Sequence, residues 1–453
     1  RRLGVTAGSV VGVLCRDHRG LVITMAACGK LGARMVLMNT GFAKPQFAEV
    51  CHRENVAVVL HDSEFLGLLD ALPADMPRVL TWVDDGTAVP DGVPTLDDIV
   101  ASNSSEPLPP PAKPGGSVIL TSGTTGLPKG APRDSVSPLA TAQIIDRIPF
   151  PHQGTMVIVS PIFHSTGWAT YTVGAAFGNR VVTARRFKAE ATLELIATHK
   201  ADMLVAVPTM LHRMVELGPE IIAKYDTSSL KVILIAGSAL SPELSNRVQD
   251  TFGDVLYNMY GSTECAIASV ATPAELRAAP GTAGRSPVTC EVVLYDDNDQ
   301  RIEGTNRRGR IFVRNGAPFS GYTDGRHKQI IDGYMSSGDM GHFNDNGLLF
   351  VDGRDRGGRL DLRDEAHASV RRREIVGLPA PFRCTGESAS DTTYSVRRVP
   401  RGGDGVPRLL GIVDHRQQQV PRADVEVALD GVGVGGRWTH HGGARGTGDR
   451  LQL

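Results

Sequence analysis

Residues Thr121 to Gly130, with the sequence TSGTTGLPKG, combine hydroxyls, glycines and one lysine directly after the apolar run SVIL. Glycine adopts backbone angles that side chains exclude, so a loop of this composition can turn its amide N–H groups toward a polyphosphate. Lys129 adds a positive charge. The same composition is also typical of an ordinary surface turn. The Walker A pattern ends in Gly-Lys-Ser/Thr, whereas Gly130 follows Lys129 here, which argues against a kinase or GTPase P-loop.

The stretch Leu256 to Cys265, LYNMYGSTEC, brings an aromatic ring, a glycine, a hydroxyl and a carboxylate together. Tyr260 offers a face on which a purine can stack, and Gly261 lets the backbone approach a ligand closely. Thr263 and Glu264 supply the hydroxyl and the carboxylate. Because Mg²⁺ binds oxygen ligands, Glu264 is a suitable ligand beside nucleotide phosphates. A pentapeptide of this kind is a weak signal when it stands alone.

A further acid, Asp339, follows a Ser-Gly pair and precedes the run GHFNDNGLLFVDGR. One carboxylate can accept hydrogen bonds from both hydroxyls of a ribose, and Arg354 can contact ribose or phosphate. An Asp after Ser-Gly is also a common turn former. We expect Gly341 to Arg354 to form two strands around a hairpin turn at Asn344 to Gly347.

Two other strings end a predicted buried strand in a loop. In Met156 to Gly167, MVIVSPIFHSTG, the loop carries His164. A histidine beside an aromatic residue is more often part of the packing than a ligand. In Lys231 to Leu240, KVILIAGSAL, the strand breaks at Gly237, before Ser238, which is also the pattern of an ordinary strand-to-helix turn.

The elements that must position these residues alternate between apolar strands and helices near the N-terminus. Strands separated by helices of about ten residues imply a parallel sheet with right-handed crossovers. From Pro280 to Tyr334 the pattern changes to short β runs, typical of a small antiparallel or barrel-like subdomain. Pro90 to Gly116 is expected to be a surface connection. The expected strands are Ser9 to Arg16, Ala33 to Met38, Val56 to Asp62 and Ser117 to Leu120, and the expected helices are Gly20 to Gly32 and Lys44 to Glu54.

Length, charge and cysteine content limit which classes of protein this chain can belong to. The 453 residues exceed the size of a single core, so two or more domains are expected. The net charge of −1 would not attract nucleic acid, and charges interrupt the most apolar early stretch, Leu21 to Asn39. We expect no transmembrane segment, although peripheral membrane contact stays open. Six cysteines without metal-ligand spacing fit a reducing cytoplasm. Residue 1 is Arg, inside what reads as a domain already under way, so we expect an incomplete N-terminus.

Five of these strings, in order between Thr121 and Arg354, resemble motifs of the adenylate-forming superfamily: acyl-CoA synthetases, firefly luciferase and the adenylation domains of peptide synthetases. The phosphate loop matches almost letter for letter. The resemblance implies an α/β fold, with a large N-terminal domain of parallel-sheet layers and a small β-rich subdomain. It also implies a two-step reaction in which ATP and a carboxylate give an acyl-adenylate and pyrophosphate, and a thiol, usually coenzyme A, then displaces AMP.

The resemblance implies a role for each matching residue. The implied catalytic residues are Lys129, Thr263 and Glu264, and the implied Mg²⁺ ligands are Glu264 and Thr125. The residues implied to border the acyl group are His164, Trp168 and Met259. The residues implied to bind ATP are Thr121, Ser122, Gly123, Thr124, Thr125, Gly126, Gly237, Ser238, Tyr260, Gly261, Ser262, Asp339 and Arg354.

The resemblance stops after Arg354. The family continues with a hinge and a Ser-Gly-Gly-Glu-Asn turn that opens a small mobile C-terminal domain, but no such turn follows here. Residues 357 to 453 contain fifteen Arg and no Lys, and the last lysine is Lys328, so the family's C-terminal lysine has no counterpart. We favour a tail translated in a shifted reading frame or from a decayed gene over a diverged domain. The predicted division is an AMP-binding adenylation domain, residues 1–354, and an aberrant C-terminal region, residues 355–453, which can be disordered.

The sequence therefore predicts an AMP-forming acid–thiol ligase that uses ATP, Mg²⁺ and coenzyme A, with catalysis impaired unless another group replaces the lysine. A medium or long fatty acid ranks first as substrate, because fatty acids are the most common substrates of ligases with this motif set. We expect Trp168, Gly174, Ala236 and Met259 to shape its pocket. Two alternatives stay open: a non-catalytic protein that holds nucleotide or acyl ligand, and an adenylation domain that loads a carrier protein, although no carrier attachment motif is evident.

Overall fold

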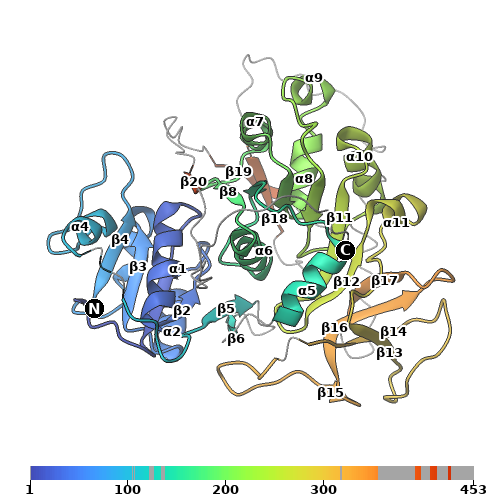
Figure 1. The fold of residues 1–453 in the computed structure, drawn as a ribbon, viewed down its shortest axis with the longest axis horizontal. Helices are drawn as coiled ribbons and strands as arrows, with labels where there is room; N and C mark the ends of the chain where they lie inside the picture. Colours follow the sequence, from blue (N-terminus) through green and yellow to red (C-terminus); the bar gives the residue numbers. More distant parts are fainter. Residues whose placement is uncertain are drawn as a thin grey trace, which may run out of the picture. The chain divides into compact units, whose positions relative to one another are not determined.

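The computed structural model describes residues 2–104, 106, 108–121, 127–133, 138–316 and 319–355, and the strands Thr393–Arg398, Leu409–His415 and Val427–Leu429. The chain divides into two compact units, Arg1–Asp355 with Val425–Leu453, and Arg356–Asp424. Figure 1 shows the elements coloured along the sequence. The first unit contains three sheets, named A, B and C below.

Sheet A is built from the N-terminal elements. Its strands and helices are β1 (Val10–Leu14), α1 (Arg19–Leu31), β2 (Arg34–Leu37), α2 (Lys44–Arg53), β3 (Val58–Asp62), η1 (Ser63–Phe65), α3 (Leu66–Leu69), β4 (Arg78–Trp82), α4 (Leu96–Ala101), β5 (Ser117–Thr121) and β6 (Lys129–Arg133). The strand order is β4-β3-β1-β2-β5-β6, and only β6 runs antiparallel to its neighbour. Successive residues face opposite sides of a strand, so Val13 packs with Leu21 of α1, whereas Leu14 packs with Phe47 of α2.

Sheet B is the larger parallel sheet. Its elements are α5 (Pro138–Arg147), β7 (Thr155–Ile158), α6 (Ser165–Ala176), β8 (Arg180–Thr183), α7 (Ala189–His199), β9 (Met203–Ala206), α8 (Pro208–Val215), α9 (Pro219–Ile222), β10 (Val232–Ile235), α10 (Pro242–Phe252), β11 (Leu256–Ser262), β12 (Ala266–Ala271) and α11 (Pro273–Ala278). The strand order is β12-β11-β10-β9-β7-β8-β20, with β12 and β20 (Val427–Leu429) antiparallel to their neighbours.

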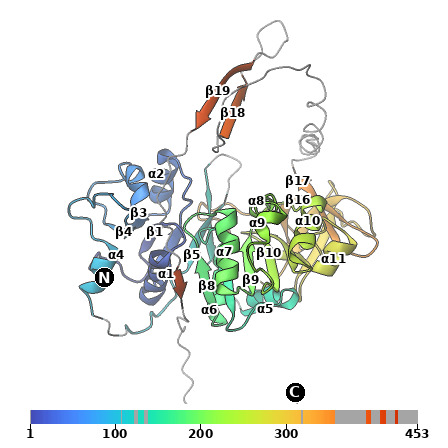
Figure 2. The same ribbon diagram turned by 90° about the horizontal axis from the view of Figure 1, so that it is seen from above.

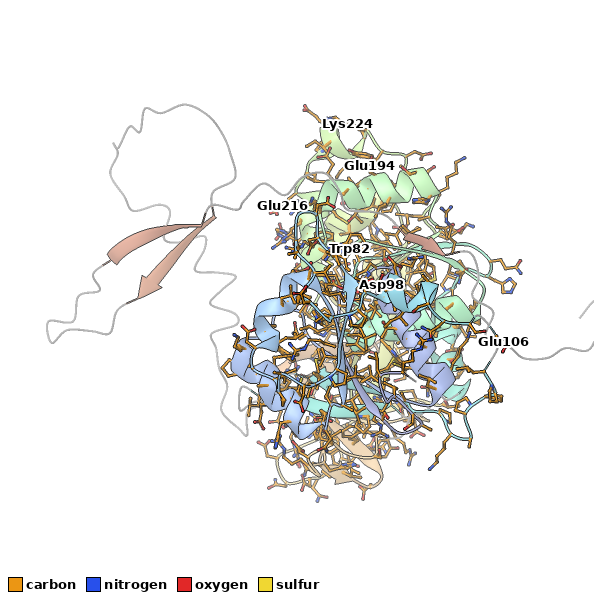
Figure 3. The ribbon with its side chains drawn as sticks, turned by 90° about the vertical axis from the view of Figure 1, so that its left-hand side faces the viewer. Trp82, Asp98, Glu106, Glu194, Glu216 and Lys224 are labelled. Carbon is orange, nitrogen blue, oxygen red and sulfur yellow. The ribbon has the colours of Figure 1, made fainter. Side chains whose placement is uncertain are left out.

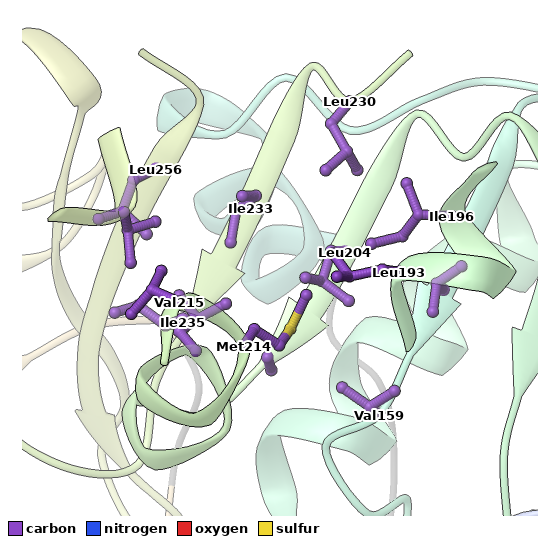
Figure 4. Packing of buried hydrophobic residues seen from close by; sticks show 14 of the residues in the cluster. Val159, Leu193, Ile196, Leu204, Met214, Val215, Leu230, Ile233, Ile235 and Leu256 are labelled. Atoms are coloured by element: carbon purple, nitrogen blue, oxygen red, sulfur yellow. The ribbon is translucent and has the colours of Figure 1, made fainter. Parts of the chain in front are cut away.

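Helices cover both faces of sheet B. On one face, Leu204 and Ile233 pack against Leu193 of α7 and Met214 of α8 (Figure 4). On the other face, Val205 and Leu234 belong to a cluster with side chains of α5 and α6. Burying one such aliphatic side chain contributes about 1.5–3 kcal/mol. These near-continuous apolar strands are therefore stable only between two helical layers.

Helix α6 joins the cores of sheets A and B. Trp168 packs with the cluster that contains α1 and sheet A, and Val173 belongs to the cluster on sheet B. Tyr171 packs against both clusters. Gly174 also has a packing role, because a Cβ there would lie 2.6 Å from the Met156 sulfur. Helix α6 thus contributes side chains to the packing of both sheets.

Sheet C is antiparallel and follows sheet B in the sequence. Its strands are β13 (Glu291–Tyr295), β14 (Gly309–Arg314), β15 (Ile330–Ile331), β16 (Tyr334–Phe343) and β17 (Leu349–Arg354). Strands β16 and β17 form the predicted hairpin, with a turn in which the Gly347 amide donates to the Asn344 carbonyl. The second unit contains β18 (Thr393–Arg398) and β19 (Leu409–His415), which pair antiparallel (Figure 2).

The predicted fold class is confirmed, since sheets A and B are parallel α/β layers and sheet C is the small β-rich part. The surface connection predicted for Pro90 to Gly116 contains a helix, α4, whose start is capped by Thr95. The local Thr95–Asp98 capping box explains that helix, and the prediction overlooked it. None of the helices in the described residues combines the length and the apolar character needed to span a membrane.

Candidate active site

The carboxyl ends of the parallel strands gather several predicted site residues at one edge of sheet B. Strands β7, β9, β10 and β11 are parallel neighbours, so the residues after them emerge on the same side. His164 is the N-cap residue of α6 after β7, Gly237 and Ser238 follow β10, and Tyr260 lies near the end of β11. Gly237 and Ser238 are exposed, and Gly237 has a φ of 93°, which favours glycine.

The turn after Tyr260 is fixed by its own backbone. Gly261 lies against β12 so closely that a Cβ would be 1.8 Å from the Ala266 carbonyl oxygen, which excludes any side chain. The Ser262 hydroxyl accepts hydrogen bonds from the amides of Glu264 and Cys265, each at 3.2 Å. Ser262, predicted to bind nucleotide, therefore orders the turn that presents Glu264.

Arg133 connects this turn to strand β6. Its guanidinium donates to the Thr263 carbonyl and, at 3.3 Å, to the Glu264 carbonyl. Burial lowers the pKa of Arg133, while Glu264 acts in the opposite direction. The strand that leaves the phosphate-loop segment thus holds the backbone of the two predicted catalytic residues.

Glu264 is 7% exposed and is oriented by Tyr322. The Tyr322 hydroxyl donates to its Oε1 at 2.5 Å. Burial raises the pKa of the Glu264 carboxyl, but the Tyr322 hydrogen bond and the charge of Lys328 outweigh that effect and leave the pKa below its ordinary value. A carboxylate has about four acceptor positions, so this ionised group retains capacity for a hard cation. Its donor chemistry fits the predicted Mg²⁺ role.

Asp339 forms the other acidic point of the site. The Tyr260 hydroxyl donates to Oδ2 at 2.8 Å, and Arg354 Nη1 lies 3.2 Å from Oδ1. The Asp339 amide donates to the Ser337 hydroxyl at 3.1 Å, and both residues lie within β16. Burial raises the pKa of Asp339, and the negative charge of Glu264 adds to the rise, against the opposing effects of Arg354 and Tyr260. The Tyr260 hydrogen bond places Asp339 beside the end of β11, the strand that leads into the turn carrying Glu264.

The phosphate-loop prediction is only partly within the described residues. Ser122, Gly123, Thr124, Thr125 and Gly126 lie outside them. Thr121 and Lys129 are described, and they face each other as the last and first residues of β5 and β6. The loop is consequently shorter than the predicted Thr121 to Gly130, because the antiparallel pairing extends to both of these residues.

Lys129 is held close to Glu264 through an aromatic ring. Its Nζ lies 4.9 Å from the centre of the Tyr322 ring, whose hydroxyl contacts Glu264. Such a cation–π contact contributes about 0.5–2 kcal/mol. The exit of the loop is held as well, since Arg53 donates to the Pro128 carbonyl at 2.5 Å.

The three predicted acyl-site residues have different surroundings. The His164 side chain is exposed and its ring lies 4.4 Å from that of Phe163. Trp168 packs with the sheet A cluster, and Met259 packs with the sheet B cluster that also includes Tyr171. These contacts are packing roles, and an acyl contact stays a prediction.

Sequence reasoning missed Tyr322, Lys328, Arg133 and Arg53. No local pattern marks them, because each acts on a residue distant in sequence; Tyr322 and Glu264 are 58 positions apart. Arg133 lies on β6, which pairs antiparallel with β5. Had Lys129 to Arg133 been predicted as the second strand of a hairpin, Arg133 could have been considered for the site.

A second polar cluster lies beneath α1. Cys15, His18 and Asp62 bring possible metal-ligand atoms within 4.8 Å of one another. However, His18 Nδ1 accepts from the Gly20 amide, so the proton is on Nε2, which donates to Asp62 at 2.7 Å. Arg185 also lies 3.3 Å from Asp62. Each ligand atom is occupied and a guanidinium is adjacent, so this cluster is a structural network.

A cavity of about 290 Å³ opens beside that cluster. It is lined by side chains of α1, β4 and α4, including Trp82, which is labelled in Figure 3, and Asp97. The indole also contacts Arg185, whose guanidinium carbon lies 4.4 Å from the ring centre. None of the lining residues belongs to the candidate active site.

Comparison with known proteins identifies the family of the chain. The model of the family described as AMP-binding enzyme matches residues 1–323. An indoleacetate–CoA ligase from Aromatoleum aromaticum is 30% identical over 78% of this chain and 69% of its own length. A 4-coumarate–CoA ligase from Narcissus pseudonarcissus is 24% identical over 77% of this chain and 66% of its own length. The chain thus spans about two thirds of the length of the curated relatives it matches.

Solved structures share the fold. The N-terminal domain of FACL13 from Mycobacterium tuberculosis superposes with a TM-score of 0.66 at 21% identity, covering 78% of this chain and 88% of that one. The o-succinylbenzoate coenzyme A synthetase of Bacillus subtilis, solved in complex with AMP, gives a TM-score of 0.63 at 23% identity, with the same coverages of 78% and 88%.

Proposed function

Because the chain belongs to the AMP-binding enzyme family, we propose that it activates a carboxylic acid with ATP and transfers the acyl group to coenzyme A. The observation that carries the proposal is that Asp339, on β16 of sheet C, is hydrogen-bonded by Tyr260 of β11, the strand that leads into the turn carrying Glu264. Tyr322 orients Glu264, and Tyr260 and Arg354 orient Asp339.

Each acid has a distinct task in this proposal. Asp339 accepts hydrogen bonds from the ribose hydroxyls, and Arg354 neutralises its charge. Glu264, kept ionised, holds Mg²⁺, which when bound neutralises the phosphates of ATP. Lys129 and the hydroxyls of the phosphate loop contact the same phosphates. Tyr260 and the exposed residues Gly237 and Ser238 surround the adenine.

Adenylate formation needs little proton chemistry, so positioning and charge are what these residues contribute. A carboxylate oxygen attacks the α-phosphorus, and the pyrophosphate leaves with the electron pair of the broken P–O bond. Groups that are already oriented toward the developing charge lower this barrier without reorganising. The fixed turn around Gly261 and the tether from Arg133 supply that order.

We infer a hydrophobic carboxylic acid as the substrate. His164, Trp168 and Met259 are proposed to border it. Fatty acids remain candidates, and the relatives named as indoleacetate–CoA ligase and 4-coumarate–CoA ligase support testing ring-bearing acids beside them. The proposal that coenzyme A accepts the acyl group is supported by the names of the same relatives. The division at residues 354 and 355 is proposed to separate the adenylation domain from the aberrant tail.

Pyrophosphate exchange into ATP tests the proposal. A panel should contain fatty acids of graded length, indoleacetate and coumarate, with and without Mg²⁺. Exchange that depends on one acid and on Mg²⁺ is expected, followed by a thioester when coenzyme A is added. Binding of an acyl-adenosine sulfamate without any exchange would support a non-catalytic protein instead. Acyl transfer only to a carrier protein would support the carrier-loading alternative.

A further inference from the structure

Lys328 brings its ammonium group into the candidate active site. Its Nζ donates to the Ser337 carbonyl at 3.3 Å, and it lies 3.3 Å from the position that a Cβ on Gly338 would take. Asp339 is the next residue. Within the described part of the chain, no carboxylate forms an ion pair with this ammonium. An ammonium has three donors, so two of them are available after the contact with Ser337.

The charge of Lys328 acts on both acids of the site. Burial raises the pKa of the Glu264 and Asp339 carboxyls, and Lys328 works against that rise in each of them. The ammonium therefore lies in the field of both carboxylates, although it is paired with neither. A lysine that serves only the fold would be expected to form an ion pair with one of them, as Lys231 does with Asp202 at 2.7 Å.

The order of the groups along a nucleotide indicates which phosphate lies near the Lys328 ammonium. In the proposed function, the ribose lies on Asp339 and the β- and γ-phosphates lie on the Glu264 side. The α-phosphate joins the ribose to the β-phosphate, so it must pass between these two acids. We propose that Lys328 binds the α-phosphate of the nucleotide and stabilises the negative charge that develops there when the adenylate forms.

This proposal rests on the proposed function, since it takes the nucleotide to lie across Asp339 and Glu264. It also gives a role to a residue that no motif marks. In the adenylation step the carboxylate oxygen supplies the electron pair of the new P–O bond, and the pair of the broken P–O bond leaves with pyrophosphate, with no proton to transfer. A cation beside the α-phosphorus is then the contribution that one side chain can make. A compact ammonium suits a single phosphate oxygen.

Calorimetric binding of AMP and of adenosine to the full chain separates this role from a structural one. Lys328→Met removes the charge and keeps much of the apolar stem. We expect its affinity for AMP to fall about 10–100-fold, because a charged hydrogen bond to phosphate is lost, with the affinity for adenosine unchanged. Lys328→Arg should recover part of the AMP affinity. Lys224→Met, at an exposed lysine after α9 that Figure 3 labels, should change neither.

The outcomes discriminate between the two proposals. If the wild-type chain binds neither ligand, the proposed function fails and takes this inference with it. If the wild-type chain prefers AMP to adenosine and Lys328→Met keeps that preference, only the role of Lys328 is overturned. Equal losses for both ligands would also overturn it, since they indicate a role in the fold. In pyrophosphate exchange, we expect Lys328→Met to be slower by about 10²–10³-fold.

Discussion

The hydroxyl of Tyr260 donates a hydrogen bond of 2.8 Å to the Asp339 carboxylate, which connects β11 of sheet B to β16 of sheet C across 79 positions of sequence. Burial raises the pKa of Asp339, and this hydrogen bond opposes the rise. Tyr260 is itself largely enclosed, and burial raises its pKa too, so the phenol stays protonated and acts as the donor. The aromatic residue predicted to stack on a purine thus also favours the ionised form of the predicted ribose ligand.

Tyr260→Phe should therefore change the pH dependence of nucleotide binding. Only the ionised Asp339 accepts both ribose hydroxyls, so AMP affinity falls as the pH decreases through its pKa. Without the phenol, the pKa of Asp339 rises further, and the loss of affinity begins at a higher pH than in the wild type. At the alkaline end of the titration, where the carboxylate is most fully ionised in both proteins, we expect a loss of only a few-fold. AMP titrations from pH 5 to pH 8 measure this, and identical pH profiles would contradict it.

Gly261→Ala should disturb the turn that carries Thr263 and Glu264. The added methyl would lie 1.8 Å from the Ala266 carbonyl oxygen, so the backbone of β11 or β12 must move. We expect a loss of about 1–3 kcal/mol in the free energy of unfolding and a loss of AMP binding of tenfold or more.

Gly67→Ala is the matched control for that substitution. Gly67 lies in α3, and nothing is within 4 Å of the position that a Cβ would take. Alanine is the better helix former, so stability should be unchanged or higher by up to about 1 kcal/mol. Urea unfolding of both variants measures the change in stability, and AMP titration measures the change in binding. Normal AMP binding by Gly261→Ala would show that the turn tolerates the shift.

Arg133→Met should weaken nucleotide binding with little direct loss of a ligand contact. Arg133 donates to the carbonyls of Thr263 and Glu264, so its removal frees the turn while leaving their side chains in place. We expect AMP affinity to fall about 5–20-fold, as for the loss of one or two charged hydrogen bonds. Arg301→Met, at a half-exposed arginine near Glu303, is the control and should leave AMP affinity unchanged. Equal affinity in wild type and Arg133→Met would argue that Ser262 alone orders the turn.

The fold could be predicted from the sequence because its information is local. The strand that ends before Gly237 and the hairpin at Asn344 to Gly347 each follow from an apolar run and a turn signal within a few residues. Asp339 and Glu264 could be singled out for the same reason, since each lies in a short string with its own chemistry.

The supporting contacts could not be predicted, because they depend on tertiary proximity. Tyr322 reaches Glu264 from a loop of sheet C, and Arg53 reaches Pro128 from the end of α2. Neither has a sequence pattern that relates it to its partner. The Cys15, His18 and Asp62 cluster was also unforeseen, since Cys15 and His18 lie between β1 and α1 whereas Asp62 ends β3, and they become neighbours only in the folded protein.

Asp17 gives a test of the fold that does not depend on any ligand. This buried residue follows β1, and its carboxylate accepts from the Ile162 amide at 3.1 Å. Burial raises the pKa of Asp17 from 3.8 to about 7. The folded state therefore holds a proton that the unfolded state has lost between these two values. The contribution of protonated Asp17 to the free energy of unfolding is therefore fully present below pH 3.8, and it is lost as the pH rises to about 7.

Asp17→Asn should remove that dependence, since the amide oxygen can still accept from Ile162 and carries no charge. Relative to the wild type, the variant should gain about 2–3 kcal/mol in the free energy of unfolding between pH 5 and pH 8, at 1.36 kcal/mol for each pKa unit. Denaturant unfolding at both pH values measures the difference. Asp70→Asn, at an exposed carboxylate on the surface, should show the same offset from wild type at both. If the difference in unfolding free energy between Asp17→Asn and the wild type is also the same at both pH values, Asp17 is ionised in the folded protein. The polar contacts of its carboxylate would then outweigh the effect of burial on its pKa.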